Sequence, residues 1–166
     1  MSRNLDLLHP RVKEMALRLI ADSAEAKIPI LVTQTLRTIE EQDGLYAQGR
    51  TEPGPPCIHH GKRIPVGSCR IHPFGCRVTN ARGGQSYHNY GLAFDVAVLD
   101  RGTLNWIEGV DVNDNDISDY EDLGTLGERI GLEWGGRWKF ADMPHFQHTF
   151  GLTLNDLRTG KKPPKG

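Results

Sequence analysis

The chain has 166 residues, of which 37% are hydrophobic and 25% are charged, and its formal net charge at pH 7 is -1. These values are typical of a folded globular domain and exclude an intrinsically disordered chain. Because 20 basic residues are balanced by 21 acidic ones, no broad positive field favours nucleic acid as a partner.

The sequence carries no membrane-spanning signal. No apolar run approaches the roughly 20 residues that a spanning helix needs. Residues 1–10 mix polar and apolar side chains and lack the uninterrupted apolar stretch of a secretory signal. We therefore expect a monomer made in a cytoplasm without a signal peptide, and a substrate outside that cell requires a separate route of release.

The first half of the chain predicts two helices and one strand. After Pro10, apolar residues recur at helical spacing to about residue 27, and Pro29 prevents continuation. The β-branched run at 30–33 predicts a strand. The Thr-x-x-Glu pattern at 38–41 is a capping box, which predicts a second helix that stops at Gly49.

The second half is less regular. Residues 50–77 are rich in Pro, Gly, Cys and His without periodicity, which predicts a loop or an inserted knuckle. The remaining predicted elements are a strand at 93–98, a polar loop at 100–117, a helix opened by a second capping box at 118–121 and ended by Gly131, strands at 132–134 and 144–150, and a short helix from Thr153.

This order of elements predicts an α+β fold, with a small antiparallel sheet and helices packed on one side of it. No repeat and no shift in composition divides the chain. We expect a single domain over residues 1–166, with a Cys/His-rich insertion at about 51–77 and a loose tail at about 160–166.

Two distant segments carry side chains suited to metal chemistry. His88 stands in a glycine-containing turn and Asp95 in the strand that follows, so the turn can fold the imidazole back beside the carboxylate. Far downstream, the segment 142–145 offers another acid, Asp142, and another imidazole, His145. Two imidazoles and one carboxylate are a normal ligand set for catalytic zinc and leave a fourth position for water. A carboxylate beside that water can accept its proton, and Asp142 suits this role.

His148 competes with His145 as the second imidazole ligand. Side chains alternate along a strand, so residues three positions apart face opposite sides of a sheet. If this segment is a strand, only one of the two imidazoles reaches the metal.

The run Ser86-x-His88-x-x-Gly91-x-Ala93-x-Asp95, followed by Asp142-x-x-His145, resembles the zinc signature of the D-alanyl-D-alanine metallopeptidase group. It is most similar to the L-alanyl-D-glutamate endopeptidase branch, which occurs in phage endolysins and some bacterial wall hydrolases. Shorter similar stretches lie, in the right order, at 36–38, 41–42, 45–50, 78–81 and 131–136.

The resemblance implies a role for each residue of the signature. His88, Asp95 and His145 would bind zinc at the face of the sheet, and Asp142 would be the general base. Arg37 matches an arginine that polarises the scissile carbonyl or holds a substrate carboxylate. Such a cation, aimed at a developing oxyanion, can contribute several kcal/mol. Members that cut D-Ala-D-Ala usually carry Glu where Asp142 stands, which favours the endopeptidase branch.

Two further residues are candidates for substrate binding. Ser86 and Gln147 can orient substrate or metal ligands through hydrogen bonds. An ordinary turn role for Ser86 and an ordinary strand role for Gln147 remain alternatives.

The leading hypothesis is zinc-dependent hydrolysis of peptidoglycan stem peptides between L-Ala and D-Glu, by a phage endolysin that reaches the wall after a separate pore opens the membrane. A second hypothesis keeps the site but makes the chain a D-Ala-D-Ala carboxypeptidase or dipeptidase. A third is a zinc-stabilised binding module without activity.

The insertion departs from the family pattern, which runs almost directly from Arg50 to Val78. It holds Cys57, His59, His60, Cys69, His72 and Cys76. Cys-x-His and Cys-x-x-His spacings in a loop without its own core predict a second, structural zinc. Its four ligands would be Cys57, either His59 or His60, Cys69, and either His72 or Cys76. The alternatives are a Cys–Cys bridge with a spare thiol, or unpaired cysteines.

The acidic loop that begins at Asp111 resembles an EF-hand calcium loop only in part. Asp116 occupies the position where that loop needs Gly, and the final bidentate Glu is absent. We expect a solvated acidic loop.

Overall fold

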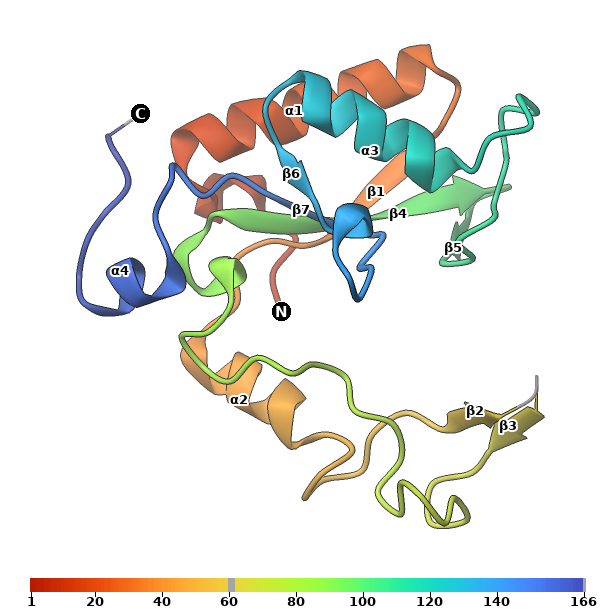
Figure 1. Ribbon diagram of the computed structural model, residues 1–166. Helices are drawn as coiled ribbons and strands as arrows, with labels where there is room; N and C mark the ends of the chain where they lie inside the picture. The colour runs from red at the N-terminus through yellow and green to blue at the C-terminus, as the bar shows by residue number, and fades with distance from the viewer. Residues whose placement is uncertain (60–61, 166) are drawn as a thin grey trace.

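The computed structural model describes residues 1–59 and 62–165 (Figure 1). Its centre is a five-stranded antiparallel sheet in which the strand order is β1-β4-β7-β6 and β5 pairs with β4. The strands are β1 (Ile30–Gln34), β4 (Ala93–Asp100), β5 (Thr103–Asn105), β6 (Glu133–Trp134) and β7 (His145–Gln147). The strands pair across long stretches of sequence, so the sheet joins both halves of the chain.

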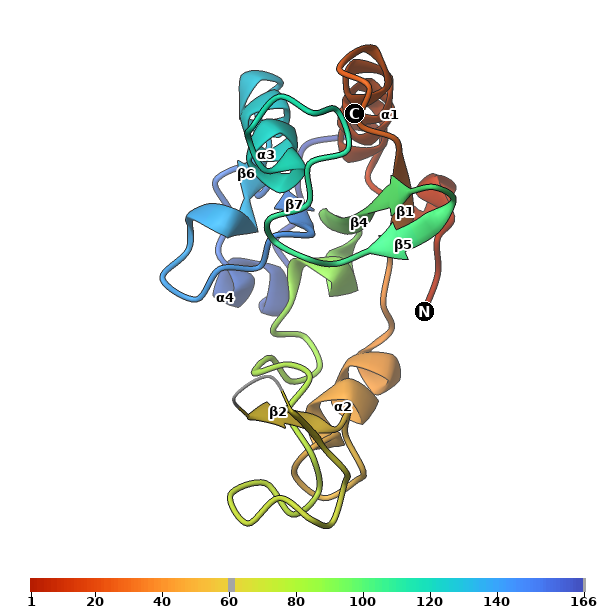
Figure 2. The same ribbon diagram turned by 90° about the vertical axis from the view of Figure 1, so that its right-hand side faces the viewer.

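Helices α1 (Pro10–Glu25) and α3 (Asp119–Arg129) lie side by side on one face of this sheet (Figures 1 and 2). Pro10 occupies the first turn of α1, where its missing N–H costs nothing, and the helix turns Val12, Leu19 and their neighbours inward. The predicted α+β class with a small antiparallel sheet is confirmed, and the pair α1 and α3 packs on one face of that sheet.

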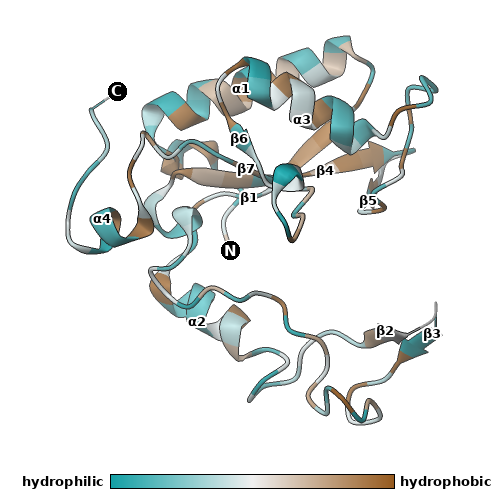
Figure 3. Cartoon of the chain, viewed as in Figure 1, coloured by the Kyte–Doolittle hydropathy of each residue, from teal (hydrophilic) through white to brown (hydrophobic). Residues whose placement is uncertain are grey.

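The core lies between these helices and the sheet. Phe94 of β4 and Phe146 of β7 are fully buried and stack with ring centroids 5.8 Å apart. Trp134 of β6 packs against Gly124 of α3, where a Cβ atom would lie only 2.2 Å from the indole ring. Figure 3 shows the same separation by hydropathy, with hydrophobic residues along β4 and hydrophilic ones on the outer surface of the helices.

Helix α2 (Ile39–Ala47) and the insertion lie on the other side of the sheet, away from α1 and α3 (Figures 1 and 2). The predicted capping box of α2 is confirmed: Thr38 Oγ1 accepts the Glu41 N–H at 3.1 Å, and Glu41 Oε2 accepts the Thr38 N–H at 2.9 Å. The short helix α4 (Leu154–Arg158) begins at a second box of this kind.

Four sequence expectations differ from the structure. Ser118 precedes α3 but makes no cap hydrogen bond, because its hydroxyl bonds the Glu108 carbonyl oxygen instead. The polar loop at 100–117 contains β5, and the insertion contains a hairpin of β2 (Cys57–His59) and β3 (Lys62–Ile64). Strand β7 is shorter than the predicted 144–150, because the chain leaves the sheet and turns at Phe150, which has φ of 53°.

The C-terminal residues return toward the start of α1, where His9 Nε2 bonds the Pro164 carbonyl oxygen at 2.8 Å. Short 3₁₀ helices occur at Leu5–Leu7 (η1), Tyr87–Tyr90 (η2) and Gly135–Arg137 (η3). Among the described residues, none of the helices has the length and apolar character needed to cross a bilayer.

Candidate active site

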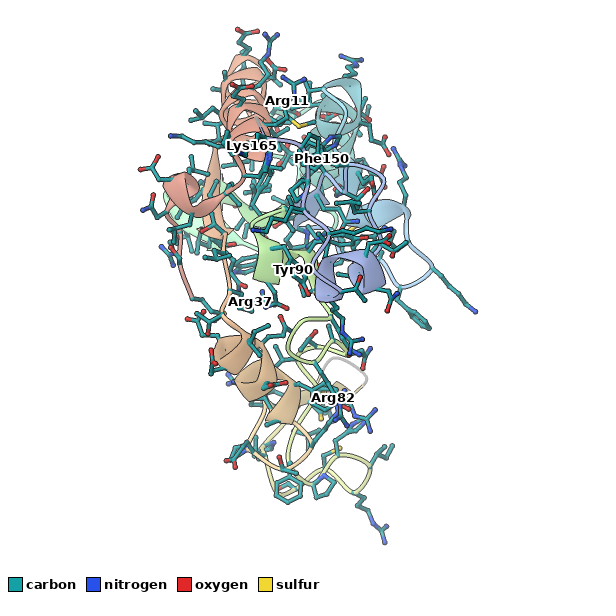
Figure 4. All side chains as sticks on the ribbon, turned by 90° about the vertical axis from the view of Figure 1, so that its left-hand side faces the viewer. Arg11, Arg37, Arg82, Tyr90, Phe150 and Lys165 are labelled. Carbon is teal, nitrogen blue, oxygen red and sulfur yellow. The ribbon has the colours of Figure 1, made fainter. Side chains whose placement is uncertain are left out.

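A cavity of about 530 Å³ opens between the sheet and α2, on the sheet face that α1 and α3 leave uncovered. Figure 4 shows Arg37 at this junction, where the chain passes from β1 into α2. The residues that line the cavity include Arg37, Ser86, His88, Asp95, Asp142, His145 and Gln147. Every candidate catalytic, substrate-binding and catalytic-metal residue from the sequence therefore meets at one cavity.

His88 is held by the 3₁₀ helix η2. Gly91 ends η2 with φ of 67°, and a Cβ atom there would lie 2.8 Å from the Leu7 carbonyl oxygen, so the turn requires glycine. His88 Nδ1 donates to the Thr35 carbonyl oxygen at 2.7 Å. This bond fixes the tautomer and leaves Nε2 as a lone-pair donor facing the cavity.

Asp95 and His145 face each other across the β4–β7 ladder, where they are direct partners in register. His145 Nδ1 lies 3.1 Å from Asp95 Oδ1. His88 Nε2 lies 3.2 Å from the same oxygen and 3.3 Å from His145 Nδ1. The turn after η2 thus folds His88 back beside Asp95, and the sheet brings in His145 from 50 residues away.

The donor atoms of this triad suit a cation. His88 and His145 are both buried, and each donates one ring N–H to an acceptor of the protein. The lone pairs of their other ring nitrogens therefore converge with a carboxylate oxygen of Asp95. Burial opposes charge on Asp95, but the two imidazoles outweigh it and hold the Asp95 pKa well below its ordinary value. Burial likewise opposes charge on His145, but Asp95 raises the His145 pKa. The pocket therefore stabilises positive charge at its centre, and this donor set fits zinc.

His145 is oriented by a hydrogen bond on the side of its ring that faces away from Asp95. Its Nε2 donates to Gln147 Oε1 at 3.0 Å, and Gln147 Nε2 donates to Glu133 Oε2 at 2.9 Å. The Trp138 ring lies 5.0 Å from the His145 ring, centroid to centroid. Because both ends of the Gln147 amide are engaged, the geometry favours a positioning role for this residue, and its predicted contact with substrate stays a prediction.

Arg37 is 8% exposed and points its guanidinium into the site. Its Nη1 donates to Gln42 Oε1 at 2.7 Å, its Nη2 donates to Gln34 Oε1, and Nη2 lies 3.8 Å from Asp95 Oδ2. Desolvation lowers the Arg37 pKa, and Asp95 opposes that shift. The Nε–H is buried without a hydrogen-bond partner.

Asp142 stands at the cavity mouth, on the turn that leads into β7. Its N–H donates to the Gly135 carbonyl oxygen at 3.0 Å, and its own carbonyl accepts the His145 N–H at 3.1 Å. Position 135 needs glycine, because a Cβ atom would lie 2.5 Å from the Asp142 carbonyl oxygen. Although the residue keeps an exposed surface, loss of water around the carboxyl raises the Asp142 pKa, and Asp95 adds to the rise.

The other sequence candidates are placed as follows. Ser86 lines the cavity just before η2 and makes no cap bond, so its hydroxyl is available to substrate. His148 lies one residue past β7 and bonds the Gly131 carbonyl oxygen at 3.0 Å, away from the triad. Residues 111–122 bring no group of three metal donors together; Asp111 instead accepts the N–H groups of Asn115 and Asp116.

The insertion brings Cys57, His72 and Cys76 together as a second group of donor atoms, and the His72 N–H donates to Cys69 Sγ at 3.4 Å. His60 and the side chain of His59 lie outside the described residues.

Sequence reasoning missed the residues that support the site. Gln34 and Gln42 hold Arg37, Thr35 orients His88, and Glu133 supports Gln147. Gln42 and Glu133 fall within stretches that resemble the family, which was the one available signal. Thr35 acts through its backbone carbonyl, which side-chain patterns do not reveal.

The chain is similar to known proteins over most of its length. A family model described as D-alanyl-D-alanine carboxypeptidase matches residues 79–148. The peptidoglycan L-alanyl-D-glutamate endopeptidase CwlK of Bacillus subtilis (strain 168) is 40% identical over 142 residues, which cover 84% of this chain and 72% of that protein.

Solved structures show the same fold. Serratia marcescens L-Ala D-Glu endopeptidase ChiX aligns with a TM-score of 0.55 and 22% identity, covering 89% of this chain and 84% of that chain. A mutant of the vancomycin resistance D,D-pentapeptidase VanY, in complex with Zn(II), aligns with a TM-score of 0.54 and 16% identity over 90% and 82% of the two chains. The LD-carboxypeptidase LdcB gives a TM-score of 0.52 and 22% identity over 95% and 78%.

The extent of the match to CwlK, the His-Asp-His triad and the common fold lead to one assignment. The chain belongs to the D-alanyl-D-alanine metallopeptidase family, in its L-alanyl-D-glutamate endopeptidase branch.

Proposed function

We propose that this chain is a zinc-dependent endopeptidase that hydrolyses peptidoglycan stem peptides between L-Ala and D-Glu. His88, Asp95 and His145 hold the zinc, Asp142 is the general base, and Arg37 binds the developing oxyanion. The observation that carries the proposal is the convergence of two imidazole lone pairs and one carboxylate oxygen, all within 4.8 Å of one another, in the wall of a cavity.

When bound, zinc supplies a Lewis acid that activates water and polarises the scissile carbonyl. Asp142, at the mouth of the same cavity, accepts the proton of the attacking water and passes it to the leaving amine. A raised pKa suits this second step, because a more basic carboxylate holds the proton until the amine takes it.

Arg37 stabilises negative charge on the carbonyl oxygen. Its guanidinium is held rigidly by Gln34 and Gln42 and is largely removed from water. A fixed cation in such a site needs no reorganisation as charge develops on the substrate. Ser86 also lines the cavity and donates its hydroxyl to the substrate backbone.

The choice of bond rests on two observations. The relative with 40% identity is named for L-alanyl-D-glutamate cleavage, and the shorter acid at position 142 favours that branch. The matching family model bears the name of a D-alanyl-D-alanine carboxypeptidase, which supports a second candidate reaction, the release of a terminal D-Ala.

One digestion experiment distinguishes the endopeptidase reaction from the carboxypeptidase reaction. Purified sacculi are incubated with the zinc-loaded protein, and the soluble products are identified by mass spectrometry. Endopeptidase action yields peptides that begin with D-Glu and leaves L-Ala on the muramyl residue, whereas carboxypeptidase action removes only D-Ala. Asp142→Asn protein is the matched inactive control. If neither product forms in excess of this control, the chain is a binding module and the proposed activity is wrong.

The endolysin role, with release through a separate pore, stays a prediction from the sequence. Expression of the chain in a bacterial cytoplasm with and without a pore-forming protein tests it. Lysis that needs the pore is the expected result, and lysis without it contradicts this role but leaves the bond specificity untouched.

A further inference from the structure

The insertion at 51–77 is folded without an apolar core of its own. Among its described side chains only those of Cys57 and Cys69 are buried, at 1% and 5% exposure. The large apolar side chains Val66, Ile71 and Phe74 are exposed. A segment of this size cannot hold a defined conformation by hydrophobic burial alone, so another interaction has to hold it.

The cysteines and one histidine occupy the place of that missing core. Cys57 Sγ lies 2.9 Å from Cys76 Sγ and 3.6 Å from His72 Nδ1. The Cys69 thiol also interacts with Cys57. The donor atoms of Cys57, His72 and Cys76 all lie within 4.8 Å of one another, although they come from β2 and from a separate loop after β3, and Cys69 lies beside them.

The loop has the backbone features of a metal-binding knuckle. The His72 N–H points at Cys69 Sγ and donates to it at 3.4 Å. Gly75 adopts φ of 89° and bonds the His72 carbonyl oxygen at 2.9 Å, which turns the chain back toward Cys76. A side chain at Gly75 would place a Cβ atom 2.6 Å from the Pro55 carbonyl oxygen.

We propose that Cys57, Cys69, His72 and Cys76 bind a structural zinc ion that holds the insertion together. Three thiolates and one imidazole complete a closed tetrahedral set, as structural zinc sites require, and leave no position for water. Soft sulfur ligands select zinc over calcium or magnesium. This site is separate from the triad of His88, Asp95 and His145, which contains no sulfur.

Charge in the segment matches this ligand set. Residues 51–77 contain four basic residues, Lys62, Arg63, Arg70 and Arg77, and one acidic residue, Glu52, which gives a net charge of +3. Three thiolates with one divalent ion carry a net charge of -1. The basic side chains of the segment offset this charge.

The zinc also connects the insertion to the substrate cavity. The chain leaves Cys76 and within three residues reaches Val78 and Thr79, which line that cavity. Arg50 Nη1 bonds the Tyr46 carbonyl at the end of α2 at 2.6 Å and the Thr79 carbonyl at 2.9 Å. A fixed insertion therefore fixes one rim of the site at which the proposed peptidase reaction takes place.

Cobalt substitution tests the site on the full chain. The protein is stripped of metal under reducing conditions and reloaded with Co(II), and near-ultraviolet sulfur-to-cobalt charge-transfer bands are recorded. The expected result is two metal ions per chain in the wild-type protein and one in the double variant His88→Ala/His145→Ala, with charge-transfer bands in both. Because the triad lacks sulfur, these bands report the insertion alone, whatever happens at the catalytic centre.

Single variants assign the ligands. Cys57→Ser, Cys69→Ser and Cys76→Ser should each lose the bands and about half of the bound zinc, whereas Ser68→Ala, an exposed neighbour of Cys69, should keep both. If a serine variant does not fold, the charge-transfer bands of the wild-type protein and of the double variant still show whether the insertion binds metal through sulfur. One metal ion per chain without charge-transfer bands overturns the proposal. So does a thiol count of one in denatured, unreduced protein, which would mean a Cys–Cys bridge.

Discussion

Gln147 accepts a hydrogen bond from His145 Nε2 at 3.0 Å, on the side of the ring that faces away from Asp95. Because Glu133 holds the other end of the amide, the three side chains form a relay that fixes the His145 tautomer. Partners of this kind orient metal ligands without touching the metal.

Gln147→Leu should therefore weaken zinc binding at the triad by about 10–100-fold, the usual effect of losing such a partner. Competition with a chelator of known affinity measures it. Thr149→Val is the matched control, since Thr149 also bonds Glu133, at 2.8 Å, but does not touch His145. Equal zinc affinities for the wild-type and Gln147→Leu proteins would contradict the positioning role.

Asp142→Asn should lower turnover by about 10²–10⁴-fold, because the amide cannot accept the proton of the attacking water. Zinc content should stay unchanged, since Asp142 is outside the group of three donor atoms. His145→Ala, in contrast, should lose both activity and the zinc of the triad. Activity and metal content of the same preparations give the answer, and loss of zinc in Asp142→Asn would make Asp142 a ligand.

The pH profile of turnover should have an acidic limb set by Asp142. Desolvation raises the pKa of this carboxyl above its ordinary value, so activity should fall as the pH decreases through that raised pKa and the base becomes protonated. An acidic limb at or below the ordinary carboxyl range would contradict this assignment.

The raised pKa of Asp142 also affects the stability of the folded protein. A carboxyl with a raised pKa in the folded state favours folding only while it is protonated, and that contribution is lost as the pH rises through the folded-state pKa. At neutral pH the ionised Asp142 therefore destabilises the metal-free fold, and Asp142→Asn should raise its melting temperature. Thermal unfolding in the presence of a chelator measures this, and the difference should vanish at acidic pH.

Arg37→Lys should lower kcat/KM by about 10²–10³-fold, the effect expected from loss of an oxyanion donor. Lysine keeps the charge but cannot bond Gln34 and Gln42 with a rigid planar group, so the cation is no longer fixed. Arg11→Lys, on the exposed surface of α1, is the control. Undiminished kcat/KM in Arg37→Lys would show that charge alone suffices.

Gly124→Ala should destabilise the fold by about 1–3 kcal/mol, because the added methyl group would overlap the Trp134 ring. Gly44→Ala is the matched control in α2, where an added Cβ meets nothing within 4 Å. It should instead stabilise the protein by about 0.5–1 kcal/mol through helix propensity. Denaturant unfolding of the two variants checks the opposite signs.

Local sequence patterns determined much of this protein. The capping box at Thr38, the glycine turn after His88 and the apolar periodicity of α1 depend on contacts within a few residues, and the structure contains all three. The resemblance to the family likewise predicted which side chains would line the cavity. At Ser118 the same local pattern was misleading, because a carbonyl ten residues away competed for the hydroxyl.

Tertiary structure alone decided the arrangement around these residues. The ladder between β4 and β7 determines that His145 faces Asp95, and the relay through Gln147 to Glu133 exists only because β6 lies beside β7. In the insertion, the spacing of the cysteines and histidines allowed several ligand sets. The fold brings His72 and Cys76 together beside Cys57. Sequence patterns describe contacts between near neighbours along the chain. Contacts between distant residues depend on which surfaces are buried together when the whole chain packs.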